Sequence, residues 1–233
     1  MESKRNKKIF NTIMVAVIAV IAIGGVISVG FIKGWFSDEG EQAALAGKVT
    51  GVVNIERKGV SFELEEGAAL QTGDKISTNE KAGIVIESGD NTYELAENTS
   101  VVVGEYKDQK FSMEITAGEA FAVLNDGQMF GITAQERSIT ADGTVFSVNV
   151  QTGSMGVNVF EGNVDAQKGD KEVQAEDGQT ISVVGEEMTV MELQASSLNQ
   201  FNIEKALLAG EKHELCFSQE ELNKVLEDRE SEG

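Results

Sequence analysis

The feature that most constrains this chain is an apolar segment close to its N-terminus. Ile9 to Ile32 run for 24 residues without an ionisable side chain. At about 1.5 Å of rise per residue, a helix of this length reaches about 36 Å, which is enough to cross a hydrocarbon core of about 30 Å. A helix also satisfies its own backbone hydrogen bonds in lipid. The segment is therefore predicted to be a transmembrane helix over residues 9–32.

The residues on either side of this segment predict its orientation. Residues 1–8 form a short basic tail with four Lys or Arg side chains. In contrast, one basic residue, Lys33, closely follows the segment. Basic residues favour the cytoplasmic side of a membrane, and Trp35 suits the far interface. We therefore expect a single-pass protein of the cell membrane, with a cytoplasmic N-terminus and an extracytoplasmic C-terminal region.

A cleaved signal peptide is the alternative interpretation, and Ala44-Leu45-Ala46 offers a small-x-small sequence for cleavage. However, the apolar core is longer than the roughly 7–15 residues of most signal peptides, and Lys33 and Asp38 separate it from that sequence. No Cys directly follows the apolar run, so a lipoprotein anchor is excluded as well. A retained anchor is the interpretation that we favour.

The chain is strongly acidic, which limits the partners of its exported region. It has 39 Asp and Glu against 19 Lys and Arg, for a net charge of −20. A domain of this sign repels nucleic acid and anionic lipid headgroups, so we expect no nucleic-acid partner. Cys216 is the one Cys and cannot form an internal disulfide. A hydrophobic core must therefore hold the exported region together.

The region from about Lys48 to Val190 has the alternating pattern of short β-strands. Its period-2 runs are rich in Val, Ile, Phe and Thr, and Gly interrupts them about every 8–15 residues, which leaves no room for crossover helices. Gly-Asp and Asp-Gly pairs that suit tight hairpins occur at residues 89–90, 169–170, 126–127, 142–143 and 177–178. We therefore predict an all-β exported domain over residues 47–190, after a linker over residues 33–46.

The remaining segment, residues 191–233, changes from a strand pattern to a helix pattern. Apolar residues in helix-like spacing precede Gly210, which predicts a first helix. A second helix is predicted to begin after Ser218, because Ser218 and Glu221 form a capping box. We expect the C-terminal helices to dock in cis on the β domain, and the alternative is that they bind a partner protein.

A hydrophobic staple strengthens the prediction of the second helix. Phe217 and Leu222 occupy the two staple positions, before the cap and in the first turns. Leu222, Val225 and Leu226 then give the helix one apolar stripe, which is the surface expected to dock.

Few residues in the chain suit catalysis. His213 is the single His and lies between Lys212 and Glu214, so we expect it to be a solvated linker residue. Cys216 has no basic neighbour and is expected to be a small apolar contact. The sequence contains no hydrolase nucleophile elbow, no His/Cys metal cluster and no phosphate-binding Gly loop. We therefore predict no enzyme, no catalytic residue, no cofactor and no metal site.

Four motifs follow one another in the strand-rich region. They are Gly67-x-x-Leu70-x-x-Gly73-Asp74-x-Ile76-x-Thr78, Ile139-x-Ala141-x-Gly143-Thr144-x-Phe146-x-Val148, Val157-x-Val159-x-Glu161-Gly162-x-Val164 and Ala175-x-x-Gly178-Gln179. Together they resemble the FecR domain, named after the ferric-citrate regulator, over about residues 47–185. We interpret Gly143 and Gly162 as turn residues. The side chains of Phe146, Val148, Val157 and Val159 are expected to face a shared core.

This resemblance implies an exported all-β domain of solenoid or sandwich type on a membrane protein that carries information across the membrane. Some members of the family restrain a sigma factor through a cytoplasmic domain of about 80 residues, the size of a small folded unit. Residues 1–8 are too few for such a domain, so we do not expect direct anti-sigma activity. Regulators of the family also contact an outer-membrane transporter, whereas this chain ends in acidic helices.

Two functions of different classes remain open. The first is a non-catalytic binding or signalling module of the cell envelope, whose partner is an envelope protein or a glycan. The second is a structural or assembly scaffold of the envelope without a signalling role.

Overall fold

The computed structural model describes residues 42–108, 110–125 and 129–232. The chain divides into two compact units, Met1–Gly40 and Glu41–Gly233, and the described residues belong to the second unit. The predicted basic tail over residues 1–8 and the predicted transmembrane helix over residues 9–32 lie outside the described residues. Among the residues that are described, no helix is long and apolar enough to span a membrane.

The described residues form an all-β unit that is followed by helices, which confirms the predicted fold class for this part of the chain. The strands are β1 (Gln42–Thr50), β2 (Val53–Arg57), β3 (Val60–Glu63), β4 (Ala69–Gln71), β5 (Lys75–Thr78), β6 (Gly83–Ser88), β7 (Asn91–Leu95), β8 (Ser100–Lys107), β9 (Lys110–Val123), β10 (Met129–Ala134), β11 (Arg137–Gln151), β12 (Ser154–Lys168), β13 (Lys171–Glu176), β14 (Gln179–Val184) and β15 (Glu187–Glu192). The helices are the 3₁₀ turn η1 (Ala195–Ser197), α2 (Gln200–Ala209) and α3 (Gln219–Glu232). The first strand begins at Gln42, inside the segment that the sequence pattern predicts as a linker over residues 33–46.

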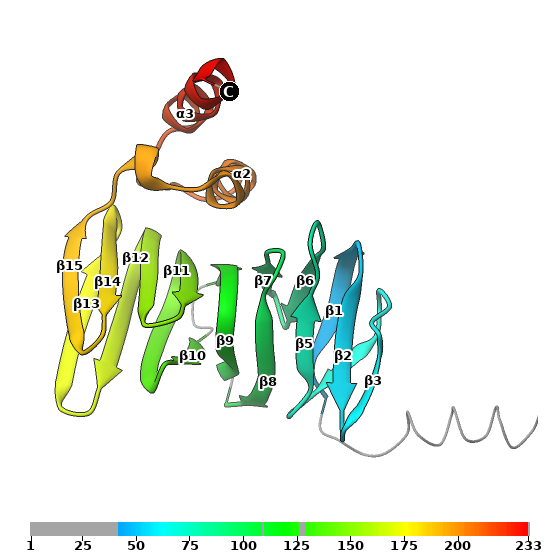
Figure 1. The fold of residues 1–233 in the computed structure, drawn as a ribbon. Coiled ribbons are helices and arrows are strands. Elements are labelled where there is room, and N and C mark those ends of the chain that lie inside the picture. The colour runs from blue at the N-terminus through cyan, green and yellow to red at the C-terminus, as the bar shows by residue number, and fades with distance from the viewer. Residues whose placement is uncertain (1–41, 109, 126–128, 233) are drawn as a thin grey trace, which may run out of the picture. The chain divides into compact units, whose positions relative to one another are not determined.

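Strand pairing folds one continuous sheet into two layers, as in a sandwich (Figure 1). The first layer has the order β4-β1-β6-β7-β9-β11-β12-β14-β15, and we call it the helix-side layer. The second layer has the order β3-β2-β5-β8-β9-β10-β11-β12-β13. Three long strands, β9, β11 and β12, belong to both layers.

These long strands pass from one layer into the other at glycines. Gly118 of β9, Gly143 of β11 and Gly162 of β12 have φ values of 94°, 54° and 84°. The β11–β12 register shifts between Asp142 and Phe146, as at a β-bulge. Glycine adopts positive φ at little cost, so it is the natural residue for such bends. The prediction of a hairpin turn at residues 142–143 is therefore wrong, because Gly143 bends a strand that continues.

Crowding at the β11–β12 crossing explains two of the sequence motifs. A Cβ atom added to Gly162 would lie 3.0 Å from both the carbonyl oxygen of Gly143 and the Oγ1 atom of Thr144. Thr144 is fully buried, and its hydroxyl lies 2.8 Å from the carbonyl oxygen of Asp142 and 3.0 Å from that of Asn163. The Gly-Thr and Glu-Gly motifs are thus two sides of one tight backbone crossing.

The main hydrophobic core lies between the layers. Phe146 is 1 % exposed and belongs to this core together with Val148, Val157 and Val159, as the motifs predict. The ring of Phe130 stands 6.2 Å from that of Phe146 and 4.3 Å from that of Tyr93, measured between centroids. Aromatic rings therefore occupy the centre of the unit, where each buries a large apolar area.

The remaining predicted turns fall into three groups. Gly89 and Gly169 have positive φ and connect the paired strands β6 and β7, and β12 and β13, which confirms the predicted hairpins there. Gly178 also has positive φ, but β13 and β14 on either side of it pair with different parts of β12 and not with each other, so the prediction of a hairpin at residues 177–178 is wrong. The Asp-Gly pair at residues 126–127 lies outside the described residues.

The Gly-Asp motif at residues 73–74 also has a structural role. Asp74 is 1 % exposed, and the Nε and Nη2 atoms of Arg57 donate to its two carboxylate oxygens at 2.7 and 2.6 Å. The backbone N–H of Gln71 donates to the same carboxylate at 2.7 Å. This bidentate ion pair holds β2 against the turn that precedes β5.

Candidate binding groove

Helix α2 packs on the outward face of the helix-side layer, and α3 packs against α2 and η1. Phe121, Val145 and Phe160 belong to a second hydrophobic cluster, separate from the core between the layers, which they share with residues of both helices. Leu222 of α3 is 1 % exposed and is part of this cluster. The prediction that the helix docks in cis on the β unit is therefore confirmed.

The N-terminal ends of both helices are capped, and the cap of α3 is the one that its sequence predicts. The backbone N–H of Glu221 donates to Oγ of Ser218 at 3.2 Å, and the N–H of Ser218 donates to the Glu221 carboxylate at 2.9 Å. This is the capping box of α3. At the start of α2, the side chain of Asn199 accepts a hydrogen bond from the N–H of Asn202 at 2.9 Å.

A buried carboxylate joins α2 to β9. Glu119 is 6 % exposed, and the side-chain amides of Asn199 and Asn202 donate to its two oxygens at 2.6 and 2.7 Å. Burial raises the pKa of Glu119 above its usual range, although the hydrogen bonds from Asn199 and Asn202 act in the opposite direction. Sequence reasoning missed this contact, because its partners lie about 80 residues away along the chain.

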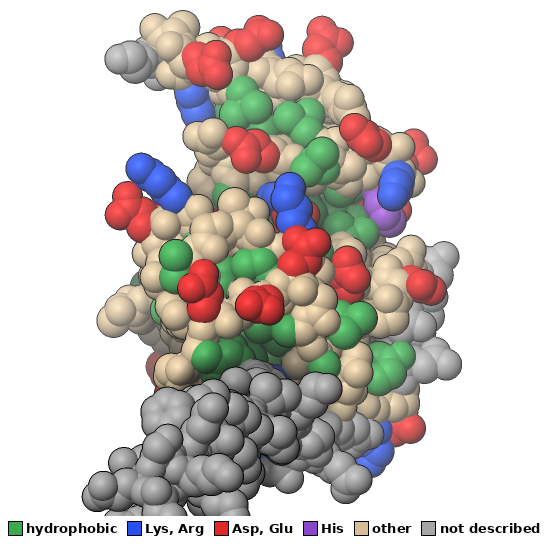
Figure 2. Space-filling model, turned by 90° about the vertical axis from the view of Figure 1, so that its right-hand side faces the viewer, with side chains coloured by type: hydrophobic (Ala, Val, Ile, Leu, Met, Phe, Trp, Pro, Cys, Tyr) green, Lys and Arg blue, Asp and Glu red, His purple; other side chains and the backbone are tan. Residues whose placement is uncertain are grey.

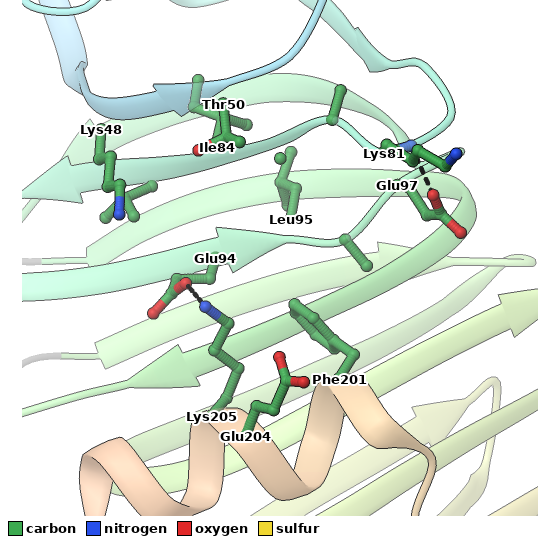
Figure 3. Close-up of a pocket in the computed structure, with 14 residues that line it drawn as sticks. Lys48, Thr50, Lys81, Ile84, Glu94, Leu95, Glu97, Phe201, Glu204 and Lys205 are labelled. Atoms are coloured by element: carbon green, nitrogen blue, oxygen red, sulfur yellow. Dashed lines mark hydrogen bonds and ion pairs between the residues drawn. The ribbon is translucent and has the colours of Figure 1, made fainter.

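A groove lies beside α2, between this helix and strands β1, β6 and β7 (Figure 3). It encloses about 280 Å³. Its apolar surface includes Val85 and Phe201, whereas the neighbouring Ile84 and Leu95 belong to the core between the layers. The basic side chains that line it are Lys48, Lys81 and Lys205, and the acidic ones are Glu94, Glu97 and Glu204. Figure 2, which views the β1–β3 end, likewise shows basic side chains (Lys or Arg) and acidic side chains around hydrophobic ones.

Two of the glutamates are held in place by neighbouring groups. Lys205 of α2 forms an ion pair with Glu94 of β7, and its ammonium nitrogen lies 5.7 Å from the centroid of the Phe201 ring. The Glu97 carboxylate accepts a hydrogen bond from the backbone N–H of Lys81 at 2.5 Å. The ammonium groups of Lys48 and Lys81 have no ionic partner in the described part of the chain. Two free positive charges thus line the groove of a strongly acidic protein.

The groove continues on the other side of Phe201 into a second hollow of about 410 Å³. Ala96, Glu97 and Phe201 line both hollows. The second hollow is lined by the buried Glu119 and by several side-chain amides. These amides are Asn98, Asn149, Gln151, Asn199 and Gln200. We call the two hollows together the α2 groove. It has a charged half and an amide half, which meet at Phe201.

The two residues that the sequence offered for chemistry lie away from the groove. Nδ1 of His213 stands 2.8 Å from the Glu161 carboxylate, and His213 is partly enclosed where a solvated linker residue was predicted. Cys216 packs against the helix–sheet cluster as predicted, and burial raises its pKa to about 11, so it is a thiol at neutral pH. Over the described ranges, no group of three or more His, Cys, Asp or Glu side chains is arranged to hold a metal ion.

The buried carboxylate predicts a pH dependence of stability. The pKa of Glu119 is raised in the folded state, so folded protein retains this proton to higher pH than unfolded protein does. The contribution of Glu119 to stability therefore falls as pH rises from the ordinary Glu pKa of about 4.3 to the raised folded value. In a Glu119→Gln variant this decline should vanish, which urea unfolding across that pH range measures.

The control for this prediction is Glu220→Gln on the exposed side of α3. Its urea midpoints should follow the wild-type pH profile. A Glu119→Gln profile that also matches the wild type would show that the carboxylate is not buried in the folded protein.

The family comparison supports part of the sequence resemblance. Residues 74–165 match the model of the family described as FecR protein. The match contains the motifs around Phe146 and Gly162, begins inside the motif over residues 67–78 and ends before the motif over residues 175–179. No curated protein matches the chain.

Two solved structures are similar to the chain. Both are crystal structures of a protein from Parabacteroides distasonis ATCC 8503 that is provisionally described as an anti-sigma factor. The first structure covers 56 % of this chain, with 18 % sequence identity and a TM-score of 0.48. The second structure covers 58 % of this chain, with 19 % sequence identity and a TM-score of 0.47. The matched part spans 64 % of each of those chains.

Proposed function

We propose that this chain, which carries a FecR domain over residues 74–165, is a non-catalytic binding and signalling module of the cell envelope. In this proposal residues 9–32 anchor the protein in the cell membrane, and residues 1–8 lie in the cytoplasm. The β unit and its helices lie outside, where the α2 groove binds an envelope protein or a glycan. The observation that carries the proposal is this groove, which is built where α2 docks on the sheet.

The lining of the α2 groove suits recognition. Phe201 offers an apolar face, the ammonium groups of Lys48 and Lys81 are free to pair with acidic groups, and the amide half offers both donors and acceptors. Peptide groups and sugar hydroxyls are the chemistry that such a mixture binds.

The position of the groove also suits signalling. One wall is α2, which is attached to the sheet through the Glu119 contact and the cluster around Phe121. A ligand in the groove touches both the helix and the strands, so it can favour one arrangement of the helix over another. Binding can thus be transmitted to the rest of the protein without any chemical step.

The test compares cells that express wild type, a groove variant or no protein. The groove variant combines Lys81→Glu and Phe201→Ala, and the control combines Lys224→Glu and Leu208→Ala, which lie on exposed positions of the helices. Protease treatment of spheroplasts should remove the β unit in every strain that expresses wild type, the groove variant or the control variant. Transcript profiles of the groove variant should match those of the deletion, while the control should match wild type.

Other outcomes assign the protein differently. A β unit that is protected from protease would overturn the proposed topology. A groove variant with a wild-type transcript profile would overturn the signalling role of the groove. If the deletion leaves transcription unchanged but removes an envelope assembly, the protein is a scaffold.

A further inference from the structure

The strand β15 forms an open edge of the helix-side layer. It pairs with β14 along its whole length and with no other strand of the described residues. Figure 1 shows β13 and β15 together at the end of the layers opposite β1, β2 and β3. An edge strand presents a row of backbone N–H and C=O groups, and these groups can pair with another chain.

This edge lacks the features that protect other edges of the same unit. β4 has three residues, β3 has four, and β13 begins with Lys171. Short length, charged side chains (lysine above all), proline and bulges are the usual means of keeping an edge from pairing. The charged side chains of β15 are the two glutamates at its ends. β15 has six residues in unbroken register with β14 and contains neither Lys nor Pro. It is therefore the edge most ready to accept a further strand.

Apolar side chains beside this edge are incompletely covered. Met188 and Val190 lie opposite Val183 and Ile181, two core residues, so they face the space between the layers. Val190 is nevertheless 36 % exposed. An open hollow of about 580 Å³ separates β13 from β15 at this point, and Val173 and Met188 line it. A strand added to β15 would cover these side chains and extend the core.

The charges of β15 determine what kind of strand would fit. Glu187 and Glu192 are exposed at its two ends, and neither has an ionic partner among the described residues. If a second copy paired antiparallel through this edge, Glu187 would lie opposite Glu192 at both ends. Like charges that are directly opposite destabilise a strand pair, so self-pairing is disfavoured. Opposite charges at these positions would stabilise the pair.

We propose that β15 is a docking site for an extended basic segment of another protein, which adds to the helix-side layer as an antiparallel strand. The segment carries a Lys or Arg opposite Glu187 and another opposite Glu192. Because these two glutamates are five positions apart in β15, the two basic residues are five positions apart in the segment. It carries apolar residues opposite Met188 and Val190. The pattern is basic-x-apolar-x-apolar-basic. This proposal depends neither on the α2 groove nor on the membrane anchor.

The test measures binding of a synthetic peptide to the purified full-length chain by calorimetry. The peptide is Ser-Lys-Thr-Val-Thr-Val-Lys-Ser with blocked ends, and a twin has Glu in place of both Lys. The Glu187→Lys, Glu192→Lys double variant should bind the Lys peptide about tenfold or more weakly, because two attractive pairs become repulsive. It should bind the Glu peptide more tightly than wild type does.

Two further measurements separate strand addition from general attraction of opposite charges. The control variant Glu227→Lys, Glu230→Lys changes the net charge equally on α3 and should bind the Lys peptide as wild type does. Amide hydrogen exchange over residues 187–192 should slow when the peptide binds. The proposal is overturned if the Lys peptide does not bind the wild-type protein. It is also overturned if the control variant loses as much affinity as the Glu187→Lys, Glu192→Lys variant, or if the peptide leaves amide hydrogen exchange in β15 unchanged.

Discussion

Replacing Phe146 by Ala is expected to lower the free energy of unfolding by about 3–5 kcal/mol, the usual cost of truncating a fully buried Phe. The ring is 1 % exposed, stands next to Phe130 and lies a few residues beyond the bend at Gly143. A domain of this kind is typically stable by about 5–15 kcal/mol, so the loss is a large part of the total. Thermal and urea unfolding followed by circular dichroism measure it.

The matched control for Phe146→Ala is Val184→Ala, because Val184 is 66 % exposed on β14. This change should move the unfolding midpoint very little. If Phe146→Ala also left the midpoint in place, the ring would not be packed in the core, and the motif around it would become a candidate binding surface.

Replacing Leu222 by Asp is expected to cost about 2–5 kcal/mol from the lost core packing alone, and the buried carboxylate adds to this loss. Leu222 is 1 % exposed in the hydrophobic cluster that also contains Phe121 and Phe160. The change should therefore detach α3 from this cluster. Urea unfolding and hydrogen exchange in α3 should both report the loss.

Leu208→Asp on α2 is the control, because Leu208 is 57 % exposed and the new carboxylate stays in water. Equal unfolding midpoints for the two variants would contradict docking of α3 in cis. In that case the apolar stripe of the helix would be free for a partner protein.

Much of the fold could be predicted from sequence because its signals are local. Alternation of apolar and polar residues predicts strands with Phe146 and Val148 in the core, and both are buried there. The capping box at Ser218 depends on residues three positions apart, and the structure confirms it. Such patterns involve neighbours along the chain, so they can be recognised without knowledge of the fold.

The glycines show where local signals become ambiguous. Gly89 stands next to Asp90 and Gly143 next to Asp142, and both glycines have positive φ. However, Gly89 closes a hairpin, whereas Gly143 bends a strand that continues. The difference lies in what each strand pairs with on either side of the glycine. Residues before Gly143 pair with β10, and residues after it pair with β9. Such long-range pairing leaves no signal at the glycine itself.

The α2 groove could not be predicted for the same reason. It needs Lys81 from the turn before β6 and Glu94 from β7. These residues meet Phe201 and Lys205 of α2, which lie more than a hundred residues away along the chain. The burial of Glu119 likewise depends on where α2 lies. In the sequence, each of the charged residues among them has the pattern of a solvated side chain.

By itself, the sequence determined the periodicity of the strands, the apolar residues of the core and the start of α3, because each follows from residues close together in the chain. The tertiary structure decided which glycines bend strands between layers, which carboxylate is buried and where the groove and the open edge at β15 lie. These features depend on which distant segments pair and on which faces remain uncovered. That outcome is set by the packing of the whole unit.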